Sequence, residues 1–216
     1  MPPFDTLADY NPDVRFLEAG SVTTVMNDGV PSEITVSTYE NGHMASAGEG
    51  AASFSYRIET PAGTVVITGD TPPSQGLVDF AQNADIVVSE IGLQPPELVG
   101  IPLFDTVFQI HVQPHDVAEI ASAAGADAIL LLTHFIISPP SNKFFGVTFE
   151  EITSCSYVDA VVAGGFDHLI ITGRDLDTVE LMDGAPDRLC RDGQPCVRLS
   201  PNSNQRNALC RQSDGR

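Results

Sequence analysis

Five residues that can bind metal ions or transfer protons are spread along the sequence, and three of them follow apolar runs. They are His43, Asp70, Glu90, His111 and His134. Asp70, Glu90 and His134 come at the ends of predicted buried strands. Ligands of α/β sheets bind outside the carboxyl ends of the strands, so these side chains are expected to converge on one cleft. Imidazole nitrogens and carboxylate oxygens suit zinc, and the pattern therefore predicts a metal centre.

Each of these residues taken alone has a simpler interpretation. A Gly-Asp-Thr sequence after a strand is ordinary turn chemistry, and a histidine at a strand end is commonly a hydrogen-bonded surface or core group. The order of all five in their local contexts is the more specific signal. Two further histidines are left out of the predicted site. His115 lies on a helix that Pro114 starts, facing solvent, and His168 begins a late strand.

The elements that must position these residues change in type along the chain. Alternating β-branched and aromatic runs predict strands at 14–17, 21–26, 34–38 and 54–58. From residue 64, strands at 64–68, 85–90 and 128–133 alternate with helices that begin at Ser74, Pro114 and Thr148. Segments 169–172 and 178–181 are predicted to close the domain as a hairpin. The pattern predicts an α/β domain over residues 1–183 and a polar, cysteine-containing, poorly ordered tail over 184–216.

Composition narrows the classes of partner. The 216 residues carry a net charge of −19, and Lys143 is the only lysine. Nucleic-acid affinity rests on Lys and Arg, so RNA and DNA are not expected partners. An alternative interpretation of the charge is that it serves only solubility. No apolar run approaches the ~20 residues of a membrane span, and the first ten residues do not resemble a signal peptide.

The four cysteines give a separate indication of the compartment. Cys155 lies in the predicted domain, and Cys190, Cys196 and Cys210 lie in the predicted tail. Their spacing does not match a zinc ribbon. A Cys190–Cys196 disulfide would imply an oxidising compartment, and free thiols in the tail are the alternative. The protein is therefore expected to be cytoplasmic or exported, and the tail cysteines favour export.

The local contexts of the five residues resemble a known series of motifs. The chain contains V-V-I-T-G-D-T at 65–71, A-D-I-V-V-S-E at 84–90, H-V-Q-P-H-D-V at 111–117 and A-I-L-L-L-T-H-F at 128–135. Together with His43, this order resembles the C-terminal portion of a metallo-β-lactamase-fold hydrolase of the ribonuclease Z and arylsulfatase-like branch. The resemblance covers about residues 14–183. It implies an αββα sandwich whose N-terminal part is incomplete here.

The resemblance also implies roles for individual residues. His43 matches a ligand of a first zinc ion, Asp70 the carboxylate that bridges two zinc ions, and His134 a ligand of the second. Glu90 and His111 match a catalytic pair that assists the leaving group. Two departures concern this pair: Ser89 stands where the branch has histidine, and Val112-Gln113 where it has Ser-Thr.

An absent motif limits the activity that the resemblance implies. The family binds zinc chiefly through His-x-His-x-Asp-His, and none of the five histidines stands in that pattern. Each zinc would keep at most two protein ligands, where a catalytic zinc has three plus water. We therefore expect an N-terminally truncated and inactive zinc hydrolase. The alternative is a non-catalytic, degenerate paralogue that acts as a binding protein.

The substrate expectation follows from a second absence. Ribonuclease Z carries a long tRNA-gripping arm between the positions of His43 and Asp70, where this chain has only 26 residues. Together with the acidic charge, this disfavours a tRNA 3′ endonuclease. It favours a small ester substrate: a phosphodiester, a sulfate ester or a lactone.

Two structural expectations complete the sequence prediction. His43, Asp70 and His134 should place donor atoms within about 6 Å of a common point, since zinc–ligand bonds measure ~2.0–2.2 Å, with Glu90 and His111 on the rim. The predicted strands at 64–68, 85–90 and 128–133 are apolar on both faces, and the helices can cover only one of them. The face left bare predicts that the chain self-associates, for example as a homo-oligomer, binds a partner along that face, or is poorly folded.

Overall fold

The computed structural model describes residues 20–27, 30–45, 48, 51–174, 177–182, 185–190 and 197–198. The strand predicted at 14–17 lies outside these residues, as do Cys196, Cys210 and most of the predicted tail. No helix of the described part is long and apolar enough to cross a membrane.

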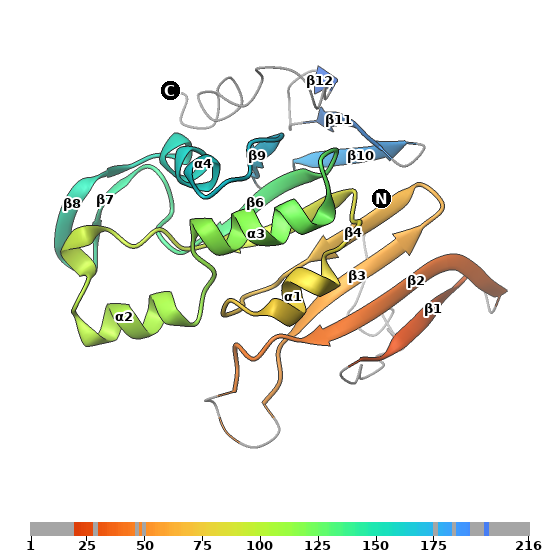
Figure 1. The fold of residues 1–216 in the computed structure, drawn as a ribbon, viewed down its shortest axis with the longest axis horizontal. Coiled ribbons are helices and arrows are strands. Elements are labelled where there is room, and N and C mark those ends of the chain that lie inside the picture. The colour runs from red at the N-terminus through yellow and green to blue at the C-terminus, as the bar shows by residue number, and fades with distance from the viewer. Residues whose placement is uncertain are drawn as a thin grey trace, which may run out of the picture.

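A mixed sheet of seven strands organises the described chain (Figure 1). Its strands, in sheet order, are β1 (Val22–Asn27), β2 (Val30–Glu40), β3 (Phe54–Thr60), β4 (Gly63–Ile67), β5 (Ile86–Ile91), β6 (Ile129–Phe135) and β9 (Ile170–Thr172). Neighbours from β1 to β4 pair antiparallel, and β4, β5, β6 and β9 pair parallel. The parallel strands bring their carboxyl ends to one edge, as the predicted convergence requires.

Helices α1 (Gln75–Phe80), α3 (Pro114–Ala124) and α4 (Ser154–Ala163) lie over one face of the sheet (Figure 1). Two of them begin where the sequence predicts. The Ser74 side chain accepts a hydrogen bond from Leu77 N at 3.2 Å, and Pro114 opens α3 after the cap residue Gln113. The predicted α/β class is confirmed.

A lobe beside these helices was not predicted. It consists of η2 (Pro96–Leu98), α2 (Pro102–Gln109) and the hairpin of β7 (Ser141–Phe144) and β8 (Val147–Ile152). Ring contacts join its parts, because Phe104 of α2 packs against Phe144 with ring centroids 5.7 Å apart. Helix α2 leads directly to His111, so the lobe flanks the predicted site.

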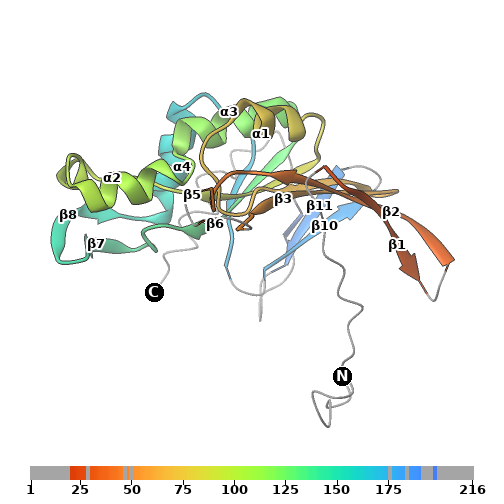
Figure 2. The ribbon, with the colours of Figure 1, turned by 90° about the horizontal axis from the view of Figure 1, so that it is seen from below.

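The two faces of the sheet belong to separate cores. The strand register aligns Val66, Val87, Leu130 and Ile170 in one row, and all four are buried in the core under the helices. Residues of the opposite parity on β6 and β9, such as Ile129, pack with Leu189 in a second core. Leu189 belongs to a small sheet of β10 (Thr178–Met182), β11 (Ala185–Cys190) and β12 (Val197–Arg198). Figure 2 shows this small sheet on the side opposite to α1 and α3.

The rest of that second face is apolar and only half-buried. The register places Val36, Ile58 and Val65 in one row that continues to the buried Ile129, and Ile67 lies beside Val88 in the next row. The small sheet therefore covers the β6–β9 end of the face that was expected to be bare. Self-association through the remaining part stays a prediction.

Three predicted elements differ in the structure. The segment at Thr148, predicted as the start of a helix, is strand β8, because Phe149 points into the core after the Phe145-Gly146 turn. Helix α4 begins instead at Ser154, with a capping box from Thr153 to Ser156. Strand β10 pairs with β11, whereas β9 joins β6.

The first residues of the predicted tail form a strand, and the boundary between residues 183 and 184 stays a prediction. Strand β11 lies in the predicted tail, yet Leu189 is only 1% exposed because it packs on the main sheet.

Candidate functional site

The structure brings all five predicted residues together at the carboxyl edge of the parallel strands. Their donor atoms form two groups, His43–Asp70–His111 and Glu90–His111–His134, within each of which all atoms lie within 4.8 Å of one another. His134 Nε2 lies 3.4 Å from Asp70 Oδ2. The expected convergence of His43, Asp70 and His134 is therefore observed. Their roles in metal binding remain proposals.

Glu90 and His111 form a buried pair beneath this edge. His111 Nδ1 hydrogen-bonds to Glu90 Oε2, and Thr71 N donates to Glu90 Oε1 at 2.5 Å. The side chains of Glu90 and His111 are only 1% and 8% exposed. The expectation that they lie on the rim is wrong, because β5 continues as far as Ile91 and carries Glu90 inside the fold.

The hydrogen bonds of two histidines fix which ring nitrogen faces the site. His43 Nδ1 lies 3.0 Å from the Ile110 carbonyl oxygen, which can only accept, so Nδ1 carries the proton. His111 Nδ1 faces the carboxylate of Glu90 in the same way. Both rings then offer the Nε2 lone pair. Metal-binding histidines are commonly held by a carbonyl or carboxylate on their second nitrogen, as these two are.

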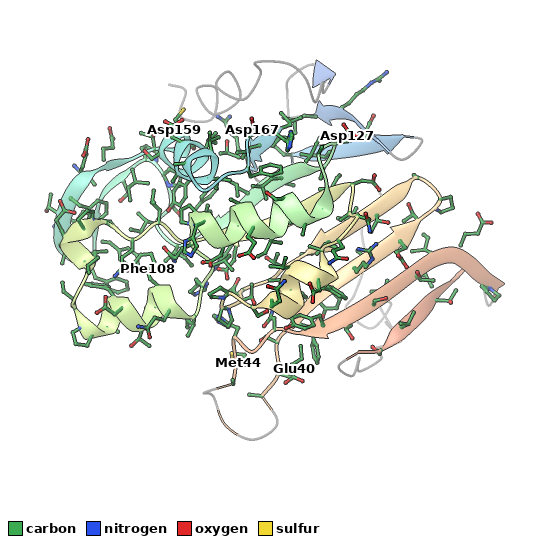
Figure 3. All side chains as sticks on the ribbon, in the orientation of Figure 1. Glu40, Met44, Phe108, Asp127, Asp159 and Asp167 are labelled. Carbon is green, nitrogen blue, oxygen red and sulfur yellow. The ribbon has the colours of Figure 1, made fainter. Side chains whose placement is uncertain are left out.

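His43 lies in the loop after β2, between Glu40 and Met44, which Figure 3 labels. The side chain of Asn41 holds this loop in place. Asn41 is buried, with only 4% of its surface exposed. Its Oδ1 accepts from His43 N at 3.1 Å, and its Nδ2 donates to the Thr68 carbonyl oxygen at 3.1 Å. Asn41 therefore links the loop of His43 to the end of β4, two residues before Asp70.

Asp70 and His134 form the exposed part of the site. Their side chains are 40% and 55% exposed. His134 has φ of +42°, a left-handed conformation that costs a residue other than glycine about 1–2 kcal/mol. Gly69, before Asp70, has φ of +60°, and a Cβ there would lie 3.1 Å from the Phe54 carbonyl oxygen. Glycine adopts this conformation without strain, so the strained backbone is that of His134, and such strain is typical of functional positions.

The donor set fits a zinc ion. Each group supplies three nitrogen or oxygen donors, and donors of a tetrahedral zinc lie about 3.4 Å apart, within the spread observed here. The sequence-based count of two ligands per ion assumed a pair of ions. A single ion at this edge would have three protein ligands, His43, Asp70 and His134, and His111, whose Nδ1 is bonded to Glu90, would be left to transfer a proton.

Sequence reasoning missed the residues that orient the ligands. Asn41 gave a signal, because Asn-Gly-His after a strand is typical of a side-chain-capped turn. The Ile110 carbonyl and the Thr71 amide gave none, since backbone groups carry no residue type.

Comparison with known proteins gives structural similarities only. No family model and no curated protein matches the sequence. Among solved structures, the metallo-β-lactamase-fold protein YhfI from Bacillus subtilis is 18% identical, with a TM-score of 0.49, over 73% of this chain and 52% of that one. A putative metal-dependent hydrolase from Parabacteroides distasonis is 15% identical, with a TM-score of 0.41, over 71% and 56%. Human tRNase Z, short form, is 19% identical, with a TM-score of 0.35, over 52% and 38%.

These similarities agree with the predicted resemblance but are low. The chain spans about half the length of the first of these structures, and every TM-score is below 0.5. They establish no activity, which has to be argued from the geometry of the site.

Proposed function

We propose that this site binds one zinc ion and hydrolyses a small ester, such as a phosphodiester, a sulfate ester or a lactone. One observation supports the proposal most strongly: His43, whose Nδ1 is held by the Ile110 carbonyl, shares a donor group with Asp70, and Asp70 Oδ2 lies 3.4 Å from His134 Nε2. Asp70 and His134 would complete the donor set from the solvent side. A partly exposed site leaves room for water and substrate, as a catalytic zinc requires.

The residues of the chain would divide the chemistry between them. Zinc, when bound, would supply Lewis acidity and an activated water. His43, Asp70 and His134 would hold the ion. His111 would give a proton to the oxygen of the leaving group, and the Glu90 carboxylate at Nδ1 would stabilise the imidazolium before that transfer. The second oxygen of Glu90 accepts from Thr71 N, which fixes the carboxylate and therefore the ring.

Hydrolysis of chromogenic esters tests this function. The purified full chain is assayed with and without zinc on bis(4-nitrophenyl) phosphate, 4-nitrophenyl sulfate and a simple lactone. We expect zinc-dependent turnover of one class, a loss of at least about 100-fold in His111→Phe, as expected for a general acid, and complete loss in Asp70→Ala. Turnover that is unchanged by both substitutions would contradict the assignment.

The non-catalytic alternative makes a different prediction for the same experiment. A binding protein would take up zinc through the same donors and hydrolyse none of the three esters. A tRNA 3′ endonuclease is disfavoured by the net charge of −19, since few Lys and Arg residues are available to contact phosphates.

We propose that the protein functions in an oxidising compartment. Cys155 and Cys190 are both disulfide-bonded, and no cysteine of the described part is free. Disulfides persist mainly in exported proteins. Thiol titration of the native protein, purified from its natural source under alkylating conditions, should find neither cysteine reactive; two reactive thiols would contradict this compartment.

A further inference from the structure

A hollow of about 310 Å³ opens beside His111, between α2 and the start of α3. Its walls include Gln94, Asp105, Phe108, Gln109, Gln113 and Asp116. His111 also lines it and belongs to both groups of metal donors. His111 therefore adjoins both the metal donors and this hollow.

Two acceptor atoms of the wall, from Asp105 and Gln94, hold no hydrogen bond from a described residue, and Gln109 adds an amide that can both donate and accept. Gln94 Nε2 already donates to Asp105 Oδ1 at 3.0 Å, and Gln113 Nε2 donates to the Phe108 and His111 carbonyls at 3.2 and 3.3 Å. Asp105 Oδ2 and Gln94 Oε1 have no hydrogen-bond partner within the described chain. A ligand that fits these atoms carries hydrogen-bond donors or positive charge.

An anionic ligand is disfavoured at the same place. A helix N-terminus ordinarily attracts anions, but the start of α3 is already occupied by a carboxylate. Asp116 Oδ2 accepts from Gln113 N at 2.8 Å. No described Lys or Arg lines the hollow. His115 also lines it, with Nε2 3.0 Å from Asp116 Oδ1, and an adjoining hollow of about 220 Å³ adds Glu119 to the acidic wall.

The size and the apolar part of the wall limit the ligand further. The volume lies at the lower end of the roughly 300–1,000 Å³ typical of ligand pockets. Phe108, which is 3% exposed, and Pro73 supply apolar surface for methyl or methylene groups. A small alkyl ammonium group meets both conditions.

We infer that this hollow binds the alcohol part of the ester substrate, and that this alcohol carries an ammonium group. The inference rests on the proposed function, because it takes His111 as the residue that protonates the leaving alcohol. It narrows the substrate class to esters of small amino alcohols.

Binding of two alcohols of the same shape tests the inference without zinc. Backbone amide shifts of the metal-free full chain are followed by NMR at low salt, during titration with choline and with 3,3-dimethylbutan-1-ol, its uncharged analogue. We expect choline to bind about two- to fivefold more tightly, the range of a partly exposed charge pair. The shifts should centre on Gln94, Asp105 and Gln109.

Three variants decide whether the charge of the hollow is responsible. Asp105→Asn keeps the Oδ1 acceptor that Gly100 N uses at 3.1 Å, and it should abolish the preference for choline. Gln109→Lys, at an exposed position on α2, should weaken choline binding to the same extent. Leu103→Lys adds the same charge to α2 at a position 63% exposed and outside the hollow, and it should change nothing.

Equal affinity for the two alcohols, or a preference that survives both Asp105→Asn and Gln109→Lys, would overturn the inference. Because no zinc is present, this result is independent of the metal site. Failure of zinc binding would overturn the proposed function and leave the choline measurement as it stands.

Discussion

The site contains two carboxylate–histidine pairs whose surroundings are opposite. Glu90 and His111 are 1% and 8% exposed, and Asp70 and His134 are 40% and 55% exposed. The buried pair is held by the Thr71 amide and by the strand that carries Glu90. Asp70 of the exposed pair follows β4, and His134 lies near the end of β6 with a strained φ of +42°. The same residue types therefore fix geometry in one place and remain open to a ligand in the other.

This difference predicts how stability and metal binding are divided. A buried charge or hydrogen-bonding group is costly to leave without its partner, whereas an exposed pair contributes little. We expect substitutions in the buried pair to change the free energy of unfolding. Substitutions in the exposed pair should change metal affinity.

The largest expected effect is that of Glu90→Ala. Removal of this carboxylate leaves His111 Nδ1 and Thr71 N without their acceptor inside the fold. We expect a loss of about 3 kcal/mol in the free energy of unfolding, measured by urea denaturation. Asp70→Ala is the matched control and should cost no more than about 0.5 kcal/mol. Equal losses in the two variants would remove the distinction between the pairs.

A smaller effect on stability is expected for Asn41→Ala. Asn41 holds the loop of His43 and the end of β4, so its loss should cost about 2 kcal/mol of stability. It should also weaken zinc binding about tenfold, because a residue that orients a ligand is removed. Ser53→Ala, which removes the Ser53 Oγ contacts to Asn41 and to Met44 N but leaves the bonds of Asn41 to His43 N and Thr68 O, serves as the control in calorimetry. Unchanged zinc affinity in Asn41→Ala would limit this residue to a structural role.

The smallest expected effect is a gain in the free energy of unfolding, seen when two substitutions of His134 are compared. His134→Gly and His134→Ala both remove the imidazole, but only glycine relieves the strain of φ at +42°. The glycine variant should be more stable than the alanine variant by about 1 kcal/mol, in thermal or urea unfolding. If the alanine variant were equally stable, the backbone of His134 would not be strained in solution.

The parallel half of the molecule was the more predictable from sequence. Its strands read as apolar runs, so Asp70, Glu90 and His134 could be placed at their ends. Ser74 and Pro114 marked two helix starts correctly because caps act locally.

Tertiary contacts decided what the sequence could not indicate. The capping-box pattern at Thr148 was overridden because Phe149 packs into the core from a strand. The burial of Glu90 depends on the path of β5 past the end of β4. The segment of β11 was too polar to suggest a strand, yet Leu189 packs on the main sheet. The orientation of His43 depends on the carbonyl of Ile110, 67 residues away in sequence.

Zinc titration of the metal-free full chain by calorimetry tests the central claim most directly. We predict binding of one equivalent of zinc, weakened at least about tenfold by Asp70→Ala and by His134→Gly, since each removes one donor of a small set. Both variants should remain folded in the same buffer. No binding of zinc by the wild-type chain, or binding that both variants retain in full, would contradict the account.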